Sequence, residues 1–236
     1  MEWQDEAILL SLSRHGETSA VAQLMTAGHG RHGGLVRGGA GKVARAALQP
    51  GNRLQVTWRG RLPEQLGSVT WELLAAAGTA WLHDPRRLAA VTAACALTAL
   101  ALPDREPHPR VFAGMTALLA GLAEEPWPGI YVRWELYLLE DLGFGLDFTA
   151  CAATGVAEGL VYVSPKSGQA VSAAGGEAYR DRLLPLPAFL IDGGPGSPQQ
   201  WLDGLRLTGY FLERHVLGPH GKRLPPARAR LFDRLK

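Results

Sequence analysis

The glycine-rich segment at residues 28–33 comes closest, of all the patterns in this sequence, to a nucleotide-binding motif. It matches the G-x-G-x-x-G spacing of dinucleotide-binding loops letter for letter. Such a loop needs a helix directly after it and an acidic residue about 20 positions later, which binds the ribose. Here Leu35 and Val36, which favour a strand, follow the glycines, and position 53 is Arg53. We therefore interpret the match as a coincidence within a flexible loop.

Other patterns that suggest catalysis or metal binding are also incomplete. Residues 38–42 resemble a phosphate-binding loop, but Val36 stands where its first glycine should be and Val43 where its Ser or Thr should bind Mg²⁺. The sequence has no G-x-S-x-G or H-E-x-x-H motif. His29 and His32 lack a Cys or carboxylate partner at ligand spacing, so we expect solvent-facing loop residues. The sequence predicts a protein that is not an enzyme and has no cofactor and no metal.

Basic residues of the N-terminal region are the more informative side chains. From Arg14 to Leu62 the chain has eight cations and one anion, Glu17, whereas residues 81–150 have five cations and nine anions. Such a local excess of positive charge is typical of a surface that binds a polyanion. The eight cations are Arg14, Arg31, Arg37, Lys42, Arg45, Arg53, Arg59 and Arg61.

These cations fall in a region whose pattern predicts β-structure. Runs of apolar and strand-forming residues alternate there with segments rich in turn-forming residues, and Pro50-Gly51 suits a type II turn. Short strands of this kind with a glycine-rich hairpin favour a small β-barrel of the oligonucleotide/oligosaccharide-binding (OB) kind, and a fragment of a β-sandwich is the alternative. The expected strands are residues 6–13, 19–25, 35–37, 53–58 and 68–74.

After Gly78 the pattern becomes helical. Asp84 and Pro85 form a helix start, and Pro103 ends that helix. Further helices are expected at residues 111–124, 130–142 and 198–216, the last of which opens on a capping box. That box consists of Ser197 and Gln200, with Pro198 between them.

The fold class expected from these elements is α+β. We predict an OB-fold DNA-binding domain at residues 1–80 and a helical domain at residues 81–236. Within the helical domain, residues 151–176 form a small insert with a hairpin, whose turn lies at residues 165–168.

Composition indicates a globular protein of the cytoplasm. The chain has 236 residues, of which 47% are hydrophobic and 19% charged. Its two cysteines, Cys95 and Cys151, are too few for a disulfide framework and indicate a reducing compartment. The acidic N-terminus lacks the basic opening of a secretory signal, and the longest uncharged run, residues 88–103, is too short to span a membrane. We expect a cytoplasmic, nucleoid-associated protein with no membrane partner.

Short motifs run in order along nearly the whole chain. They are Trp3-x-Asp5-Glu6-Ala7-Ile8, Arg14-His15-Gly16-Glu17-Thr18-Ser19, Gly30-Arg31-His32, Leu35-Val36-Arg37-Gly38-Gly39, Leu48-Gln49-Pro50-Gly51-Asn52, Glu135-Leu136-x-Leu138-Leu139-Glu140-x-Leu142-Gly143-Phe144, Cys151-Ala152-Ala153-Thr154-Gly155, Tyr162-Val163-Ser164-Pro165-Lys166-Ser167-Gly168 and Leu207-Thr208-Gly209-Tyr210-Phe211-Leu212. As an ordered set they resemble the RecO family of DNA repair proteins, as found in α-proteobacteria. The resemblance implies an N-terminal OB-fold, a helical domain and a zinc-finger-like insert.

The resemblance also implies a function in recombinational repair. A RecO-like protein binds and anneals single-stranded DNA, binds double-stranded DNA, and with RecR helps to load RecA onto DNA coated by single-strand-binding protein. Independently of the family, a basic barrel with aromatic residues such as Trp58 and Trp71 is the usual platform for single strands. We predict a DNA-binding set of Trp58 with the eight cations named above, although a strand tryptophan is as often a core residue. An RNA- or ribosome-associated OB-fold protein, or a small enzyme that binds a nucleotide, is the alternative.

Two further expectations rest on the resemblance. Zinc-bearing members carry C-x-x-C twice in the insert, whereas this chain has Cys151-x-x-Thr154 and Ser172-x-x-Gly175. One thiol cannot hold a tetrahedral zinc site, so we expect a metal-free, hydrogen-bonded hairpin.

The second expectation is a docking site for the acidic, apolar-ended tail of single-strand-binding protein. We predict that Arg206, Tyr210 and Arg214 of the C-terminal helix form it, beside Trp201 and Leu205. The alternative is that these aromatic residues belong to the core.

Overall fold

The computed structural model of the chain describes residues 1–62, 65–77 and 83–236. The chain divides into two compact units. The first comprises Met1–Ala123 and Pro225–Leu231, and the second Glu124–Leu224 and Phe232–Lys236. The domain boundary expected at residues 80 and 81 lies outside the described residues.

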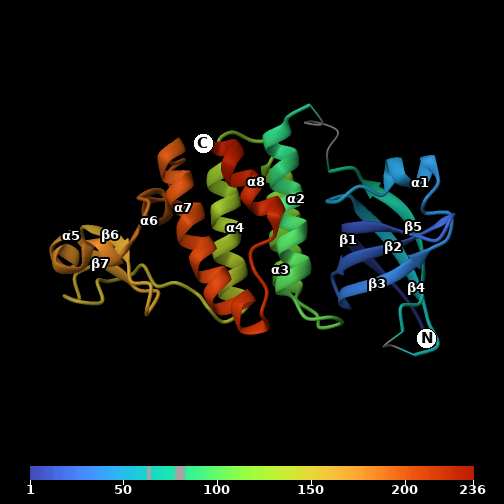
Figure 1. Cartoon of the computed structure of the whole chain (residues 1–236), viewed down its shortest axis with the longest axis horizontal. Coiled ribbons are helices and arrows are strands. Elements are labelled where there is room, and N and C mark those ends of the chain that lie inside the picture. Colours follow the sequence, from blue (N-terminus) through green and yellow to red (C-terminus); the bar gives the residue numbers. More distant parts are fainter. Residues whose placement is uncertain (63–64, 78–82) are drawn as a thin grey trace. The chain divides into compact units, whose positions relative to one another are not determined.

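A closed five-stranded barrel opens the first unit (Figure 1). Its strands follow each other around the ring in the order β1-β2-β3-β5-β4, and β3 pairs with β5 in parallel while the other neighbours are antiparallel. This closed ring is OB-like, which confirms the expected barrel and excludes the sandwich fragment. The strands are β1 (Glu2–His15), β2 (Ser19–Thr26), β3 (Gly30–Val36), β4 (Arg53–Arg59) and β5 (Ser68–Ala75).

Strand β3 begins well before the expected residues 35–37, and its first half is the segment interpreted above as a flexible loop. Gly30–Val36 instead pairs with β2 over its full length. The glycines fit there because β3 approaches the core closely: a Cβ atom on Gly34 would lie 2.2 Å from a methyl group of Val69. Packing therefore overrides the low strand propensity of glycine. A short helix that the sequence did not predict, α1 (Lys42–Ala47), connects β3 to β4.

Trp58 lies at the centre of the barrel core, where Leu9, Leu24 and Val56 are also buried. The chain must pass close to its ring, and Gly67 allows this, since a Cβ atom there would lie 2.4 Å from the indole. Gly67 also has a positive φ of 63°, which a residue with a side chain rarely adopts.

Two helices complete the first unit alongside part of a third. Helix α2 (Pro85–Ala101) starts where expected, because Asp84 accepts hydrogen bonds from the backbone N–H groups of Arg86 and Arg87. Its buried Cys95 thiol donates to the carbonyl of Leu9 on β1, at 3.7 Å. Helix α3 (Pro109–Gly121) follows, and α8 (Pro226–Leu235) begins in this unit.

The second unit is built on helices α4 (Trp127–Asp141) and α7 (Pro198–Phe211). Thr208 of α7 donates a hydrogen bond to the buried carboxylate of Glu135 on α4. The capping box at Ser197 and Gln200 is present in both directions, as predicted. After α7 the chain continues through a π-helical turn (Leu212–Leu217) and a 3-10 turn (Gly218–His220), and the short helix α6 (Phe189–Asp192) precedes it.

A small sheet forms the insert of the second unit. Its hairpin joins β6 (Leu160–Val163) to β7 (Ala170–Ser172), as the sequence predicted, and β8 (Leu184–Pro185) pairs with the other side of β6. Between β7 and β8 lie α5 (Ala173–Gly176) and a 3-10 helix (Glu177–Arg182). Among the described residues of the whole chain, no helix has the length and apolar character needed to cross a membrane.

Candidate nucleic-acid interface

Three of the eight predicted DNA-binding cations are ion-paired within the first unit. Arg59 contacts Glu2 at 2.8 Å, and Arg53 contacts Glu6. Both acids lie on β1, which runs antiparallel to β4 with Glu2 opposite Arg59. Hydrogen bonding to Arg59 lowers the pKa of the Glu2 carboxyl, and the same contact raises the pKa of Arg59. These acids precede Arg14 in the sequence, so the local charge count did not include them.

Arg31 is the third paired cation, and its contacts are structural. Its guanidinium lies 2.9 Å from the carboxylate of Asp104 and donates to the carbonyl of Leu102 at 3.0 Å. Its side chain is 17% exposed, so most of it is unavailable to a ligand. Arg31 therefore holds β3 to the segment after α2 and offers little of its charge to a ligand.

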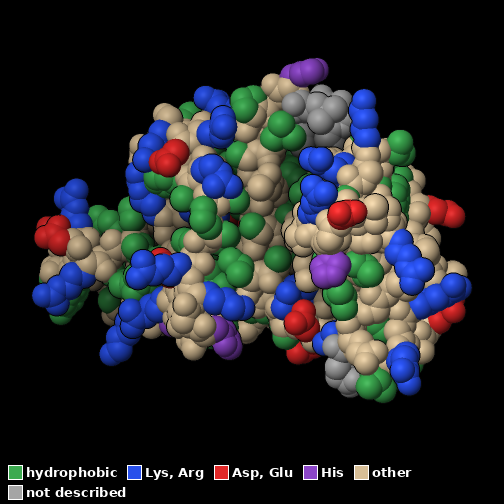
Figure 2. Space-filling model, turned by 45° about the vertical axis from the view of Figure 1, so that its right-hand side comes forward, with side chains coloured by type: hydrophobic (Ala, Val, Ile, Leu, Met, Phe, Trp, Pro, Cys, Tyr) green, Lys and Arg blue, Asp and Glu red, His purple; other side chains and the backbone are tan. Residues whose placement is uncertain are grey.

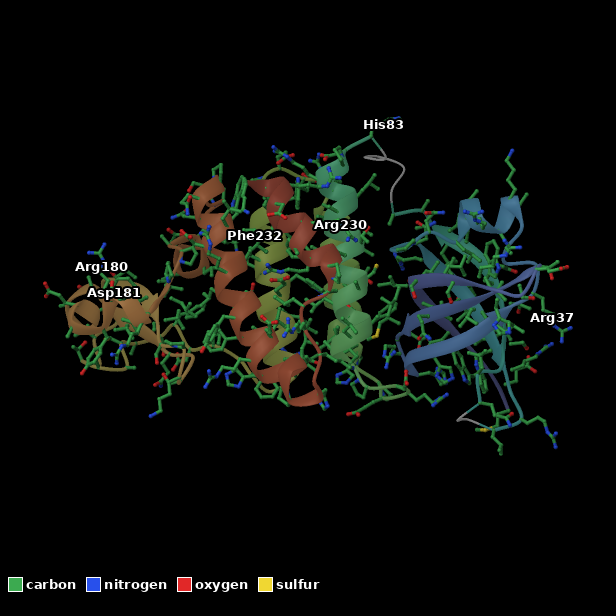
Figure 3. The ribbon with its side chains drawn as sticks, viewed as in Figure 1. Arg37, His83, Arg180, Asp181, Arg230 and Phe232 are labelled. Atoms are coloured by element: carbon green, nitrogen blue, oxygen red, sulfur yellow. The ribbon has the colours of Figure 1, made fainter. Side chains whose placement is uncertain are left out.

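Five cations have no acidic partner among the described residues. The Arg14 guanidinium donates only to the carbonyls of Gly16 and Glu17, at 3.1 and 3.2 Å. Figure 3 shows Arg37 at the surface of the barrel, with its side chain pointing away from the strands. In the space-filling view, Lys and Arg side chains are spread over the visible face of the barrel rather than gathered in one block (Figure 2). The five are Arg14, Arg37, Lys42, Arg45 and Arg61, all exposed.

A groove of about 560 Å³ lies where β3 and β5 close the ring, at the pairing of Leu35 with Ser68. We call it the β3–β5 groove. Arg37 and Arg59 contribute positive charge to it, and Trp71 lines it with a half-buried side chain that also packs against the barrel core. None of the described residues that line it is acidic. Its lining comprises Leu35, Val36, Arg37, Thr57, Arg59, Ser68, Val69, Thr70 and Trp71.

This combination of side chains suits a single nucleic acid strand. Exposed guanidinium groups bind phosphates without reading sequence, and an accessible aromatic ring stacks on any base. The hydroxyl groups of Thr57, Ser68 and Thr70 add donors and acceptors along the same groove.

The prediction that Trp58 is a stacking residue is wrong. Its side chain is 1% exposed, so no base can reach either face of the ring. Its indole N–H donates to the carbonyls of Gly33 and Leu66, at 3.2 and 3.1 Å, which ties β3 to the loop before β5. The core alternative holds for Trp58, and Trp71 on the neighbouring strand is the aromatic residue of the groove.

The expectation of solvent-facing loop residues is wrong for His32, which lies on β3, whereas His29 does lie in the β2–β3 turn with a side chain that is 37% exposed. His29 stacks on Trp3 with ring centres 4.0 Å apart, and its Nδ1 lies 3.0 Å from the carboxylate of Asp5. His32 is 5% exposed and packs edge-on against both Trp3 and Trp58. Burial lowers the pKa of His32, and the charge of Arg105 lowers it further. Within the described residues, no group of three His, Cys, Asp or Glu side chains is arranged to hold a metal.

Comparison with known proteins decides the family. Residues 1–76 match the family model "Recombination protein O N terminal", and residues 82–224 match "Recombination protein O C terminal". The chain is 52% identical to DNA repair protein RecO of Rhodospirillum centenum over 238 residues, which cover all of this chain and 95% of that protein. It is 50% identical to DNA repair protein RecO of Rhodospirillum rubrum and 49% identical to that of Cereibacter sphaeroides, covering 97% and 98% of them. The chain belongs to the RecO family. This is a family of DNA repair proteins and not of enzymes.

In this RecO-family chain, the four insert positions at which zinc-bearing members carry cysteines lie close together, but only Cys151 has a thiol. The Cys151 sulfur accepts hydrogen bonds from the backbone N–H and the hydroxyl of Ser172, at 3.2 and 3.3 Å. These bonds, with a further one from Thr154, lower the pKa of the Cys151 thiol to about 6. Gly175 completes the set, because a Cβ atom there would lie 3.0 Å from the sulfur.

The predicted partner-binding residues of the RecO-family chain lie on α7, which carries Arg206 and Tyr210, and on the π-helical turn after it, which carries Arg214. Arg214 donates to the hydroxyl of Tyr210 at 3.1 Å, and Arg206 pairs with Asp203 at 2.6 Å. The guanidinium of Arg206 also lies over the ring of Phe232 on α8, 5.3 Å from its centre. Sequence reasoning missed Phe232, which Figure 3 labels, because no local signal connects it to α7.

Trp201 and Leu205, expected beside these residues, have structural contacts instead. Leu205 is 1% exposed, and the Trp201 indole N–H donates to the carbonyl of Pro195 at 2.9 Å. Leu205 therefore offers no free apolar surface to a peptide, whereas Trp201 is half-buried, as is Phe232.

Proposed function

We propose that this chain is a recombination mediator that binds single-stranded DNA in the β3–β5 groove of its barrel. The observation that carries the proposal is the groove itself, which combines Arg37, Arg59 and Trp71 without an acidic lining residue. Phosphates supply most of the affinity for such a surface, and stacking on Trp71 tolerates any sequence. Four exposed cations extend the positive surface beyond the groove: Arg14, Lys42, Arg45 and Arg61. Arg53 and Arg59 attract phosphates less strongly, because each is paired with an acid on β1.

Exposed ion pairs do not remove Arg59 from the proposal. The Arg59–Glu2 pair is 64% and 48% exposed, and pairs of this kind contribute about 0–1 kcal/mol. A phosphate that approaches Arg59 therefore competes with a weak partner. Glu2 lowers the net attraction without blocking the groove.

Family membership supports the wider role. RecO-like proteins anneal complementary strands, bind double-stranded as well as single-stranded DNA, and act with RecR to load RecA onto DNA that is coated by single-strand-binding protein. We propose the same partners for this chain. Annealing needs no catalytic residue, because neutralised phosphates let two complementary strands approach each other.

The test of strand binding compares two substitutions of Trp71. We expect Trp71→Ala to weaken binding of oligo-dT about 5- to 100-fold, the range of one lost base–aromatic stack. Trp71→Phe should restore most of the affinity, since a phenyl ring also stacks. Oligo-dT binding should be measured by fluorescence anisotropy beside an RNA strand of the same length and a DNA duplex. Trp71→Ala that binds oligo-dT like the parent would exclude the groove, and a preference for RNA would favour the RNA-associated alternative.

Annealing tests the mediator role separately. We expect the chain to accelerate annealing of complementary strands without ATP, both bare and coated with single-strand-binding protein. Trp71→Ala should slow both reactions. A chain that binds strands but never accelerates annealing would be a binding protein only.

The docking site for single-strand-binding protein is proposed on α7 and α8. An acidic, apolar-ended peptide needs cations beside an apolar ring, and Arg206, Arg214 and the half-buried Phe232 provide both. We expect the double substitution Arg206→Glu and Arg214→Glu to abolish binding of the tail peptide, with oligo-dT binding unchanged. Arg86→Glu, on the exposed start of α2, is the matched control. Tail binding that survives the double substitution would place the site elsewhere.

A further inference from the structure

A second cationic depression lies next to the β3–β5 groove in the first unit. It has a volume of about 260 Å³ and is lined by Leu12, Arg14, Ala20, Gly39, Ala40 and Arg45. We infer that this Arg14–Arg45 pocket is a separate binding site for one nucleotide unit, held by its phosphate group. The inference deepens the proposed function, because a bound DNA strand would supply that phosphate.

The charge of the pocket favours a phosphate. Two arginines from different elements line it, Arg14 at the end of β1 and Arg45 on α1, and neither has an acidic partner among the described residues. None of the described lining residues is acidic. Guanidinium groups bind phosphate oxygens with paired, charge-assisted hydrogen bonds.

The volume of the Arg14–Arg45 pocket and its apolar lining residues limit the ligand to a single nucleotide unit. Leu12, Ala20 and Gly39 are apolar or lack a side chain, so the floor suits the face of a base or a sugar. Sites for drug-sized ligands measure about 300–1,000 Å³, and this pocket lies just below that range. It therefore fits one nucleotide and not a length of strand.

Backbone hydrogen bonds hold the walls of the pocket in place. The Ala40 N–H donates to the carbonyl of Thr18 at 3.0 Å, and the Gly39 N–H donates to the carbonyl of Val36 at 3.2 Å. Arg14 is oriented by its bonds to the carbonyls of the β1–β2 turn. A pocket with fixed walls loses less conformational entropy when a ligand binds.

The glycine-rich run at residues 38–42 thus contributes to a phosphate site by a different chemistry from a phosphate-binding loop. In such a loop the backbone N–H groups cradle the phosphate. Here the N–H groups of Gly39, Ala40 and Gly41 already donate to Val36, Thr18 and Gly38. The positive charge comes from the two arginine side chains instead.

The pocket and the groove lie on two sides of one turn. Val36 and Arg37 line the groove, while Gly39 and Ala40 line the pocket. Because these lining residues are only two to four positions apart in the sequence, one bound strand could contact both depressions. Its phosphate can be an internal diester or the monoester at a strand end, and the experiment must separate these two sources.

The first arm of the test does not depend on strand binding. Thymidine 5′-monophosphate and thymidine are each titrated into the full chain while the Nε–H signals of the arginines are followed by NMR. We expect the monophosphate to shift the Arg14 and Arg45 signals and thymidine to shift neither. Arg45→Ala should abolish the shift at Arg14, and Trp71→Ala should retain it. A monophosphate that shifts neither signal would overturn the pocket, whatever the chain does with DNA.

The second arm compares oligo-dT strands with a 5′-phosphate or a 5′-hydroxyl group. Arg45→Ala should weaken binding about two- to fivefold, as expected for one exposed charged contact. A loss confined to the 5′-phosphorylated strand identifies a strand end as the ligand, and an equal loss for both identifies an internal phosphate. Arg223→Ala removes the same charge from an exposed position outside the barrel. Equal losses in Arg45→Ala and Arg223→Ala would contradict the inference.

The two arms distinguish a failure of the proposed groove from a failure of the proposed pocket. If Trp71→Ala leaves oligo-dT affinity unchanged while the monophosphate still shifts Arg14 and Arg45, the groove is wrong and the pocket stands. If Trp71→Ala weakens binding and the monophosphate has no effect, the groove stands and the pocket is wrong.

Discussion

Trp58 and Trp71 lie on paired strands of the same barrel, yet their environments assign them opposite roles. Trp58 is enclosed on all sides and donates its indole N–H to two carbonyls, whereas Trp71 is half-buried at the groove. Residue type and strand position did not separate them. Both side chains lie on the inward face of their strands, because Trp58 pairs with the buried Val69 and Trp71 with the buried Val56. The difference lies in how far the rest of the barrel covers each ring, which strand position alone does not show.

This contrast predicts different effects on stability. We expect Trp58→Ala to lower the free energy of unfolding by about 3–5 kcal/mol, because it leaves a large cavity and two unpaired carbonyls in the core. Trp71→Ala should lower the free energy of unfolding clearly less, since the ring of Trp71 is already partly exposed to water. Urea unfolding of both variants and the parent measures the difference. Equal losses would mean that Trp71 is a core residue and not part of the groove.

His32 predicts how stability depends on pH. Burial lowers its pKa, so the unfolded chain binds a proton more readily than the folded barrel does. Stability is then fully present above the ordinary histidine pKa of about 6.5 and is lost as the pH falls from there towards the lowered value. We expect His32→Leu to flatten this decline. Thermal unfolding of the parent and variant between about pH 7 and pH 5 tests this, and parallel curves would assign the decline to other groups.

At the scale of elements, local signals were sufficient for some structures and not for others. The helix starts at Asp84 and Ser197 were predictable, because a cap and a following proline act within a few residues. The early start of β3 was not, since its glycines are favoured there by the close approach of Gly34 to the distant Val69. Helix α1 was not either, because it has no side-chain cap that would mark its start. The acidic partners of Arg53 and Arg59 were missed because they face these cations across the β1–β4 pair.

The insert carries a prediction about metal. Its Cys151 sulfur is held by hydrogen bonds from Ser172 and Thr154 in place of a zinc ion. We expect EDTA to leave the melting temperature unchanged, because no metal-binding energy is coupled to folding. Elemental analysis of chelator-washed protein should find no zinc. One zinc per chain after washing, or a melting temperature that EDTA lowers, would show that the insert retains a metal site.

At the scale of the whole molecule, charge is distributed unevenly although the net formal charge is +2. The N-terminal region has eight cations and one anion between Arg14 and Leu62. This count overstates the excess, since Glu2, Glu6 and Asp104 pair with three of the cations. The cations without acidic partners among the described residues are the ones that we expect to contact DNA, and the strength of that interaction must depend on salt.

The salt dependence of oligo-dT binding tests the central claim most directly. Each phosphate contact on a single strand adds about 0.7 to the slope of log K against log salt, so four contacts give a slope of roughly −3. We predict that Arg37→Ala with Lys42→Ala flattens the parent's slope by about 1 to 1.5 and weakens all sequences alike. Arg223→Ala with Arg234→Ala removes the same charge from exposed positions outside the barrel and should leave the slope unchanged. A barrel double variant with the affinity and slope of the parent would contradict the account, because its barrel would then not be the DNA-binding surface.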